Sequence, residues 1–348
     1  MEISNVYLKS VGTYLPPAVS IQHAIEQGWY DEKDRKLHGL KGALVAGDMS
    51  PAEMALEAAR SALQRAGSPP SSDLDLLIHA GVFPQGPDGW SLPGYVLREL
   101  GGGSAPVLEI RNGCIGMLTA LEIAIGQQGA PFFRSDVLLT AAENFSSPIF
   151  DRWRSGYSFI AGDGASAMLL SATAGFARVC SINSLTIPEL EAAHRGSQPL
   201  FPPNSITGAP IDLKARADEF AATFMPTIDT SRLMIEGQLD LITRSLKDAH
   251  IEVSDVARVI PTNAVWHVVK TFTMDPLGLP MDQSTWRFGS ARGHLGASDF
   301  AVAVEHLLTT GEVGPGDHVV LVGGAAGYSM SCAVLQILER PGWATDAA

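Results

Sequence analysis

The chain has 348 residues, of which 46% are hydrophobic, and its formal net charge is −13. This hydrophobic content in a chain longer than a typical single domain predicts two domains or two fused halves with large cores. The acidic balance, without a cluster of Lys and Arg, argues against nucleic acid and anionic membrane surfaces as partners. The apolar stretches fall short of the roughly 18 to 20 residues that a membrane-spanning helix needs.

The chain start and the cysteines indicate the compartment. The segment from Met1 to Asn5 is polar, shows no signal peptide and precedes a strand pattern. Cys180 and Cys332 lie in plain apolar strand patterns, and the cysteines show no paired spacing. This usage is typical of a reducing environment without structural zinc. We therefore expect a soluble cytoplasmic protein with no metal site.

Two amphipathic helices, each followed by a Ser-Asp pair and an apolar strand, occur in the same order in the two halves of the chain. These segments are the helix 51–66, Ser72-Asp73 and the strand 74–80 in the first half, and the helix 234–249, Ser254-Asp255 and the strand 256–260 in the second. The offset from Ser72 to Ser254 is 254 − 72 = 182.

A further pair of strands repeats at nearly the same offset. Asp136 precedes the strand 137–142, and Asp317 precedes the strand 318–323, so the offset here is 317 − 136 = 181. Two ordered pairs in near register predict a duplicated α/β unit. We place one half over residues 1–175 and the other over residues 176–348.

Cys114 lies in a glycine turn, Arg111-Asn112-Gly113-Cys114-Ile115-Gly116, ahead of an apolar helical run over 117–125. At a helix start, the free backbone N–H groups and the positive end of the helix dipole favour a thiolate and can hold an oxyanion. Cysteine also occurs often as a small buried hydrophobe, which is the alternative interpretation.

A histidine occupies the turn that the duplication pairs with Cys114. The same offset of 182 leads from position 114 to position 296, inside Gly293-His294-Leu295-Gly296, and a helical run over 300–308 follows. A histidine within hydrogen-bond distance activates a thiol, although His294 on its own would fit a surface loop or a core position.

Asp299 can orient His294 only if residues 295–298 form a turn, because five residues of regular helix would rotate it by about 140°. Its alternative role is that of a first-turn helix acid.

Four segments in the same order carry a family resemblance over nearly the whole chain. They are Val11 to Pro16, the turn at Cys114, Phe159 to Ala167 and Gly324 to Tyr328. With them the chain resembles the thiolase superfamily and, within it, the ketoacyl-ACP synthase III group. The resemblance implies an α/β fold with two duplicated halves in a five-layered αβαβα arrangement, no bound cofactor, and a homodimer. It also implies acyl-CoA or acyl carrier protein thioesters as substrates.

Two positions depart from the family pattern. Decarboxylating synthases of the group have a histidine in His-Gln-Ala-Asn where this chain has Pro261-Thr262-Asn263-Ala264, and an asparagine in Gly-Asn-Thr-Ser where it has His294. Decarboxylation of a malonyl thioester forms an enolate that needs two preorganised donors, and a threonine hydroxyl serves this poorly.

These departures favour an acyltransferase of the kind found among relatives in polyketide and antibiotic biosynthesis. Cys114 would take an acyl group from a CoA or carrier-protein thioester, and His294 would activate an acceptor hydroxyl, amine or thiol. The acceptor would be a small molecule or a second carrier protein. A decarboxylative priming synthase is the main alternative, and a noncatalytic partner subunit and a hydrolase are others.

Several further positions have expected roles at this site. The backbone N–H groups of Cys114 and Ala326 would form the oxyanion hole. Thr262 and Asn263 are possible accessory residues because they occupy the His-Gln-Ala-Asn segment. His194 lies in a loop near the entrance of related proteins and is a possible alternative base, although we favour a solvated loop histidine.

The donor and its acyl group also have candidate contacts. Arg152 and Arg154 lie where the family holds CoA or carrier phosphates, or they are ordinary surface arginines. Phe83, Trp90 and Tyr95 lie in a Gly/Pro-rich stretch that could line an acyl pocket or simply pack a loop.

Overall fold

The computed structural model describes residues 3, 5–67, 74–126 and 136–345. Within these ranges, one sheet has nine strands in the order β5-β4-β6-β7-β1-β8-β11-β10-β9. The strands are β1 (Tyr7–Tyr14), β4 (Leu74–Ala80), β5 (Val107–Ile110), β6 (Asp136–Glu143), β7 (Gly164–Ser171), β8 (Ala177–Thr186), β9 (Val256–Pro261), β10 (His318–Ala325) and β11 (Ser329–Ile337). A separate pair joins β2 (Ala18–Ser20) and β3 (Gly42–Leu44).

The strand order has an internal mirror symmetry that reflects the duplication. The run β4-β6-β7-β1 in the first half corresponds to β9-β10-β11-β8 in the second, and the halves meet where β1 pairs with β8. The first residues of β4 and β9, and likewise those of β6 and β10, are related by the same offset of 182. The predicted duplicated α/β fold is therefore confirmed. Ser72, Asp73 and Ser135 lie outside the described residues, and the division at 175 and 176, which falls between β7 and β8, stays a prediction.

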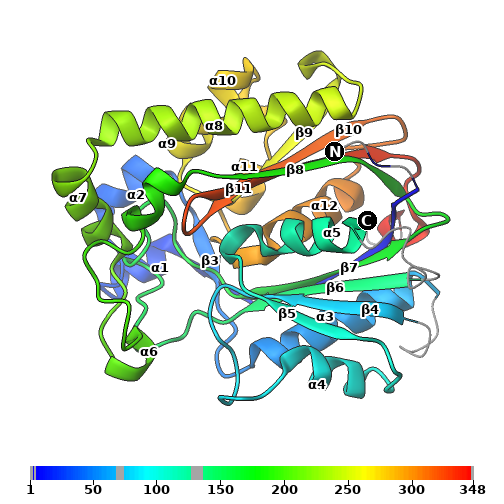
Figure 1. The fold of residues 1–348 in the computed structure, drawn as a ribbon, viewed down its shortest axis with the longest axis horizontal. Helices are drawn as coiled ribbons and strands as arrows, with labels where there is room; N and C mark the ends of the chain where they lie inside the picture. The colour runs from blue at the N-terminus through cyan, green and yellow to red at the C-terminus, as the bar shows by residue number, and fades with distance from the viewer. Residues whose placement is uncertain (1–2, 4, 68–73, 127–135, 346–348) are drawn as a thin grey trace.

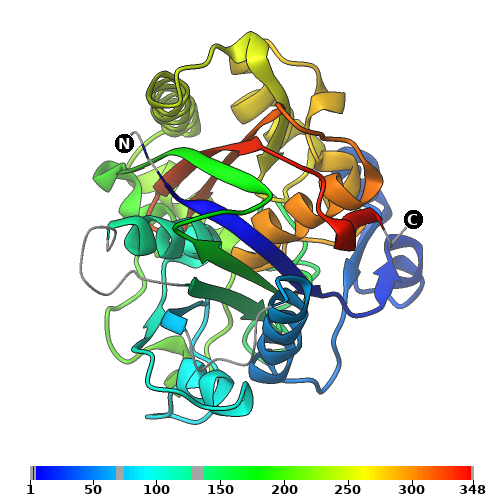
Figure 2. The same ribbon diagram turned by 90° about the vertical axis from the view of Figure 1, so that its right-hand side faces the viewer.

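Helices complete five layers around the two parts of the sheet (Figures 1 and 2). The central layer consists of α5 (Gly116–Gly126) and α12 (Asp299–Thr310), one outer layer contains α3 (Pro51–Arg65) and α4 (Leu92–Glu99), and α8 (Thr227–Asp248) lies in the other. The remaining helices are α1 (Ile21–Glu26), α2 (Glu32–His38), α6 (Asn204–Thr207), α7 (Leu213–Thr223), α9 (Trp266–Val269), α10 (Asp275–Leu277), α11 (Trp286–Gly289) and α13 (Gly342–Thr345).

Short helical turns connect these elements. They are the 3-10 turns η2 (Gly113–Ile115), η3 (Pro188–Ala193), η4 (Val253–Asp255), η6 (Met281–Gln283) and η7 (Gly296–Ser298), and the π-helical segment η5 (Lys270–Met274). Turns η2 and η7 lead directly into the central helices α5 and α12. The duplication therefore brings two helix starts to the centre of the molecule.

The sequences of the helices match their layers. The central helices are apolar on most faces because both sides are covered, and Met117, Leu118 and Phe300 are all fully buried. The outer helix α3 is instead amphipathic and begins with a capping box between Ser50 and Glu53. Its alanine face allows close packing on β1, where a Cβ atom at Gly12 would overlap the backbone of α3.

Candidate active site

Cys114 lies in the η2 turn directly before α5. Gly113 has a left-handed backbone conformation (φ +55°), and a Cβ atom there would lie 3.0 Å from the Cβ atom of Ala325. Only glycine fits this close approach without strain. Cys114 is half-buried, whereas Cys180 and Cys332 are buried in β8 and β11. Their predicted packing roles agree with this placement.

The backbone of His294 is held by the segment that follows Phe159. The His294 N–H donates to the carbonyl of Ile160 (2.8 Å), and the Gly162 N–H donates to the carbonyl of His294 (2.9 Å). A Cβ atom at Gly162 would overlap the carbonyl oxygen of Arg292, which explains why this position needs glycine. The rings of Phe159 and His294 pack edge to face, with their centroids 4.8 Å apart. The motif around Gly162 therefore positions His294.

Cys114, His294 and Asp299 form a continuous chain of polar contacts. The Nε2 atom of His294 lies 2.8 Å from Sγ of Cys114, and its Nδ1 atom lies 2.6 Å from Oδ2 of Asp299. His294 and Asp299 are almost fully buried. The contact with Asp299 is possible because residues 296–298 form a 3-10 turn before α12 begins, as the sequence required.

Asp299 is fixed by three further donors. Its Oδ1 atom accepts from the Leu295 N–H and from Nδ2 of Asn263, both at 2.8 Å, and its Oδ2 atom accepts from the Asn263 N–H, also at 2.8 Å. The Asn263 amide also donates to the carbonyl of Gly293 (2.9 Å). Asn263 therefore orients the carboxylate, which in turn orients the imidazole.

The electrostatics of this chain favour a charged imidazole. Burial opposes the charge, but the charges of Cys114 and Asp299 and the hydrogen bonds to both outweigh it, and together they raise the pKa of His294 well above its usual value. An imidazolium paired with a thiolate is the activated form of a catalytic cysteine.

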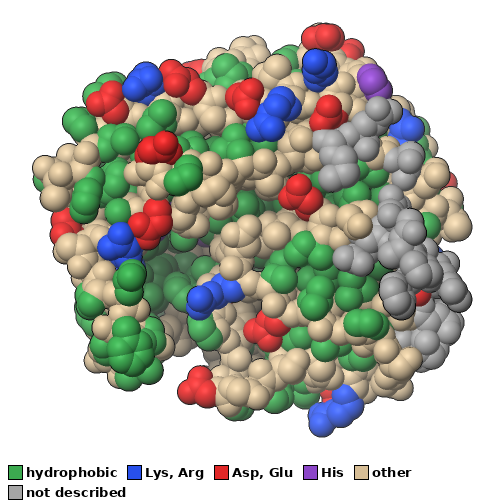
Figure 3. All heavy atoms as spheres, in the orientation of Figure 1, with side chains coloured by type: hydrophobic (Ala, Val, Ile, Leu, Met, Phe, Trp, Pro, Cys, Tyr) green, Lys and Arg blue, Asp and Glu red, His purple; other side chains and the backbone are tan. Residues whose placement is uncertain are grey.

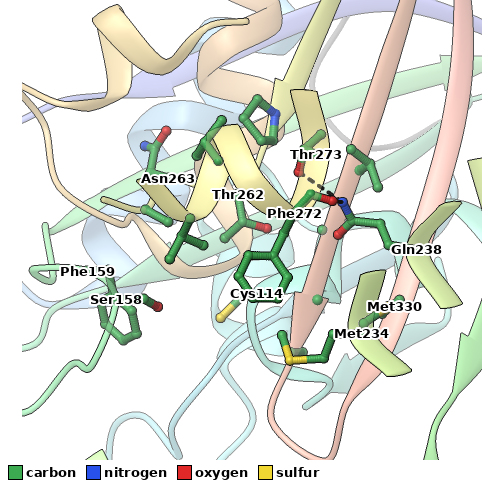
Figure 4. A pocket seen from close by; sticks show the side chains of 18 of the residues that line it. Cys114, Ser158, Phe159, Met234, Gln238, Thr262, Asn263, Phe272, Thr273 and Met330 are labelled. Carbon is green, nitrogen blue, oxygen red and sulfur yellow. Dashed lines mark hydrogen bonds between the residues drawn. The ribbon is translucent and has the colours of Figure 1, made fainter. Parts of the chain in front are cut away.

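Cys114 and His294 open into a cavity of about 200 Å³. Figure 4 shows Cys114 at this cavity together with Thr262, Phe272 and Met234. Ala326 also lines it, and its nitrogen lies 3.6 Å from the position of a Cβ atom on Gly113. The amide of Ala326 is therefore close to the nucleophile turn.

His194 lines the same cavity, with its ring centroid 4.8 Å from that of Tyr328. Burial and the nearby charge of Arg216 lower the pKa of His194 to about 4. Its imidazole is thus neutral at physiological pH and poorly suited to gain a proton. The geometry and the pKa favour His294, rather than His194, as the base.

The structure does not support the expected role of Arg152 in binding the phosphates of the donor. Its guanidinium is buried and forms a two-pronged ion pair with Asp163, at 2.8 and 2.9 Å. Asp163 also accepts from the N–H groups of Ala46 and Phe145. The arginine is committed to this internal network, so it has a structural role. Arg154 is half-exposed and donates to the carbonyl of Gly28 (2.6 Å), and its phosphate role stays a prediction.

Part of the cavity wall comes from residues that the sequence did not single out. Phe83, Trp90 and Tyr95 do not line it; Phe83 packs against Phe145 and Phe150, and Trp90 packs against Tyr95. Phe272, Gln238 and Met330 supply much of the wall instead. The sequence holds no motif for them, because they come from three elements that meet only in the fold.

The surface charges, the helices and the metal-ligating residues were compared with what nucleic acid, a membrane or a metal ion would require. Charged side chains of both signs are scattered over the face in Figure 3, without a broad patch of Lys and Arg on that face. None of the helices in the described ranges combines the length and apolar character that crossing a membrane requires. Among the same residues, no group of His, Cys, Asp and Glu is arranged to hold a metal ion.

Comparisons with known proteins cover nearly the whole chain. The family model of 3-oxoacyl-[acyl-carrier-protein] synthase III matches residues 108–185, and the model of its C-terminal region matches residues 246–337. The β-ketoacyl-[acyl-carrier-protein] synthase III of Clostridium perfringens strain SM101 is 23% identical over 96% of this chain and 100% of its own length. A synthase III of Bacillus anthracis is 25% identical over 95% and 99%.

Solved structures show the same relationship. ChlB3, described as an acyltransferase, is 41% identical, covers 98% of this chain and 100% of its own, and has a TM-score of 0.92. The priming β-ketosynthase from the R1128 polyketide biosynthetic pathway has a TM-score of 0.78 at 20% identity, with 98% of each chain covered.

The chain belongs to the thiolase superfamily, within its ketoacyl-ACP synthase III-like group. Members of this group use acyl thioesters of CoA or acyl carrier protein and need no bound cofactor. The family relationship makes the chain a transferase, and its particular reaction follows from the site.

Proposed function

We propose that this protein transfers an acyl group from a CoA or carrier-protein thioester, through an acyl-enzyme on Cys114, to an acceptor hydroxyl, amine or carrier thiol. The observation that carries the proposal is the chain of contacts from Cys114 through His294 to Asp299 at the wall of a cavity. This arrangement has a nucleophile, a base and a group that orients the base.

In the first step, the thiolate of Cys114 attacks the carbonyl carbon of the donor thioester. The backbone N–H groups of Cys114 and Ala326 stabilise the tetrahedral oxyanion, a role that their position beside the cavity supports. The intermediate collapses, the bond to the donor sulfur breaks, and the imidazolium of His294 gives its proton to the leaving thiolate. The products are a free thiol, neutral His294 and acyl-Cys114.

Acylation prepares His294 for the second step. The charge of Cys114 is one of the influences that raise the pKa of His294, and a thioester carries no charge. The pKa therefore falls once the acyl group is attached, and the neutral imidazole can act as a base. It takes the proton of the acceptor, which attacks the acyl carbon, and Cys114 leaves as a thiolate. The imidazolium and thiolate pair is then restored.

The contacts of Asn263 and Thr262 support transfer without decarboxylation. The side-chain amide of Asn263 is committed to Asp299 and Gly293. The Thr262 hydroxyl is buried and has no hydrogen-bond partner within the described part of the chain. A single rotatable hydroxyl does not supply the two preorganised donors that an enolate oxygen needs. The 41% identity to ChlB3, an acyltransferase, also supports transfer without carbon–carbon bond formation.

The likeness to the R1128 priming synthase supports a place in polyketide or antibiotic biosynthesis, and we include this in the proposal together with a homodimeric, cytoplasmic protein. The test is to incubate the protein with acetyl-CoA, malonyl-CoA and a thiol acceptor such as N-acetylcysteamine. Acyl transfer to the thiol without release of carbon dioxide is the expected result. Release of carbon dioxide with formation of a ketoacyl product would instead support a priming synthase.

A further inference from the structure

A second cavity adjoins the one that contains Cys114. It has a volume of about 180 Å³ and lies against α7 and the first half of α8, where Leu213, Phe220 and Ala221 line it. The two cavities share part of their walls, including Phe272, Met234 and Tyr328. Phe272 therefore contacts both spaces.

The backbone at Phe272 has an unusual form. It lies in η5, a π-helical segment between α9 and α10. Single π-helical turns inside α-helices are rare and occur frequently at functional sites. In Figure 4 the ring of Phe272 extends from this segment toward Cys114, with Met234 close by. The π-helical turn thus directs an aromatic ring into the cavity beside the nucleophile.

A buried glutamine fixes this segment. The Nε2 atom of Gln238, on α8, donates to the carbonyl oxygen of Phe272 (2.7 Å) and to Oγ1 of Thr273 (2.9 Å). Figure 4 marks the bond to Thr273 with a dashed line. Gln238 is only 9% exposed. Two hydrogen bonds from one buried side chain restrain the backbone on which the ring is carried.

We propose that Phe272, held by Gln238, is the specificity-determining partition that restricts acyl groups on Cys114 to short or compact ones. The inference rests on the proposed acyl transfer and names the substrate class of that same site. An apolar cavity of about 150 Å³ accommodates a benzene molecule, so the cavity at Cys114 holds an acyl group of roughly eight non-hydrogen atoms. Beyond the ring, the second cavity would receive a longer chain along Leu213, Phe220 and Ala221, although its wall also includes polar residues such as Asp218 and Thr230.

The experiment compares acetyl-CoA, hexanoyl-CoA and dodecanoyl-CoA as donors, with initial rates of acylation followed by intact-protein mass spectrometry. The variants are Phe272→Ala and, as a control, Leu200→Ala, because Leu200 is exposed and lines neither cavity. We expect the wild type to react with acetyl-CoA and hexanoyl-CoA much faster than with dodecanoyl-CoA. In Phe272→Ala, the dodecanoyl-to-hexanoyl rate ratio should rise at least tenfold, and in the control it should not change.

Gln238→Met provides a second variant in which the aromatic ring remains. It removes both hydrogen bonds to η5, so we expect the same ratio to rise about threefold. An unchanged ratio in Phe272→Ala and Gln238→Met would overturn the partition, as would a wild type that takes dodecanoyl-CoA as fast as hexanoyl-CoA. Failure of all three donors to acylate the wild type would overturn the proposed function itself, and the partition with it.

Discussion

The Nε2 atom of His294 lies 2.8 Å from the Sγ atom of Cys114, although 180 positions separate the two residues in the chain. The contact exists because the duplicated halves place their central helix starts side by side. Each turn depends on glycine in a left-handed conformation, Gly113 before Cys114 and Gly293 before His294. The consequence is that Cys114 and His294 are in contact before any substrate binds.

The variant Asp299→Asn tests whether the carboxylate of Asp299 orients His294. The change keeps the size of the side chain but removes the charge that supports the imidazolium and places an amide among three donors. We expect acyl transfer to fall by roughly a hundredfold or more. Single-turnover rates of acylation and deacylation measure the loss, with the exposed Asp240→Asn as control. A rate within threefold of the wild type would contradict the orienting role.

Gly162→Ala tests the support beneath His294. The new Cβ atom would overlap the carbonyl oxygen of Arg292, so we expect a loss of about 1–3 kcal/mol in the free energy of unfolding and slower transfer. Urea denaturation provides the stability, and Gly126→Ala is the control because its Cβ atom would meet no described atom within 4 Å. Equal stability of the two variants would show that the segment relaxes around the methyl group.

Glu143 gives a pH-dependent prediction. Burial raises its pKa from 4.5 to about 8, against the opposing effects of hydrogen bonds from Val82 and Gln85 and the charge of His294. The folded chain therefore keeps a proton that the unfolded chain releases, and this residue makes the free energy of unfolding fall as the pH rises from about 4.5 to about 8.

In Glu143→Gln this contribution disappears, so its melting temperature should rise relative to the wild type between pH 5 and pH 8. Thermal denaturation at several pH values measures the difference, and the exposed Glu109→Gln serves as control. A constant difference across this pH range would argue against a protonated Glu143.

Thr262→Val addresses the position where decarboxylating synthases have a histidine. The buried hydroxyl has no partner within the described residues, and replacing such a group by an apolar one of similar shape is neutral or stabilising by about 1 kcal/mol. We expect stability to be maintained or slightly raised and acyl transfer to be retained. Chemical denaturation and the transfer assay measure both. Loss of acylation in a folded variant would assign Thr262 a catalytic role.

The sequence predicted the fold and the central contact because both follow from a repeated order of elements. The repeat offset links the Cys114 turn to the segment of His294, and the short turn at 296–298 was the condition for Asp299 to reach the imidazole. The positions of Arg152 and Phe272 in the fold could not be predicted from the sequence, for a physical reason. The burial of Arg152 depends on Asp163 in another segment, and Phe272 enters the cavity through a local π-helical turn that leaves no periodic pattern.

The most direct test of the account is intact-protein mass spectrometry of the wild type, Cys114→Ala and His294→Ala after incubation with acetyl-CoA and hexanoyl-CoA, followed by addition of a thiol acceptor. We expect a single acyl group on the wild type that the acceptor removes, no acylation of Cys114→Ala, and slow acylation of His294→Ala that the acceptor does not reverse. Acylation of Cys114→Ala at the wild-type rate, or an acyl group mapped to another residue, would contradict it.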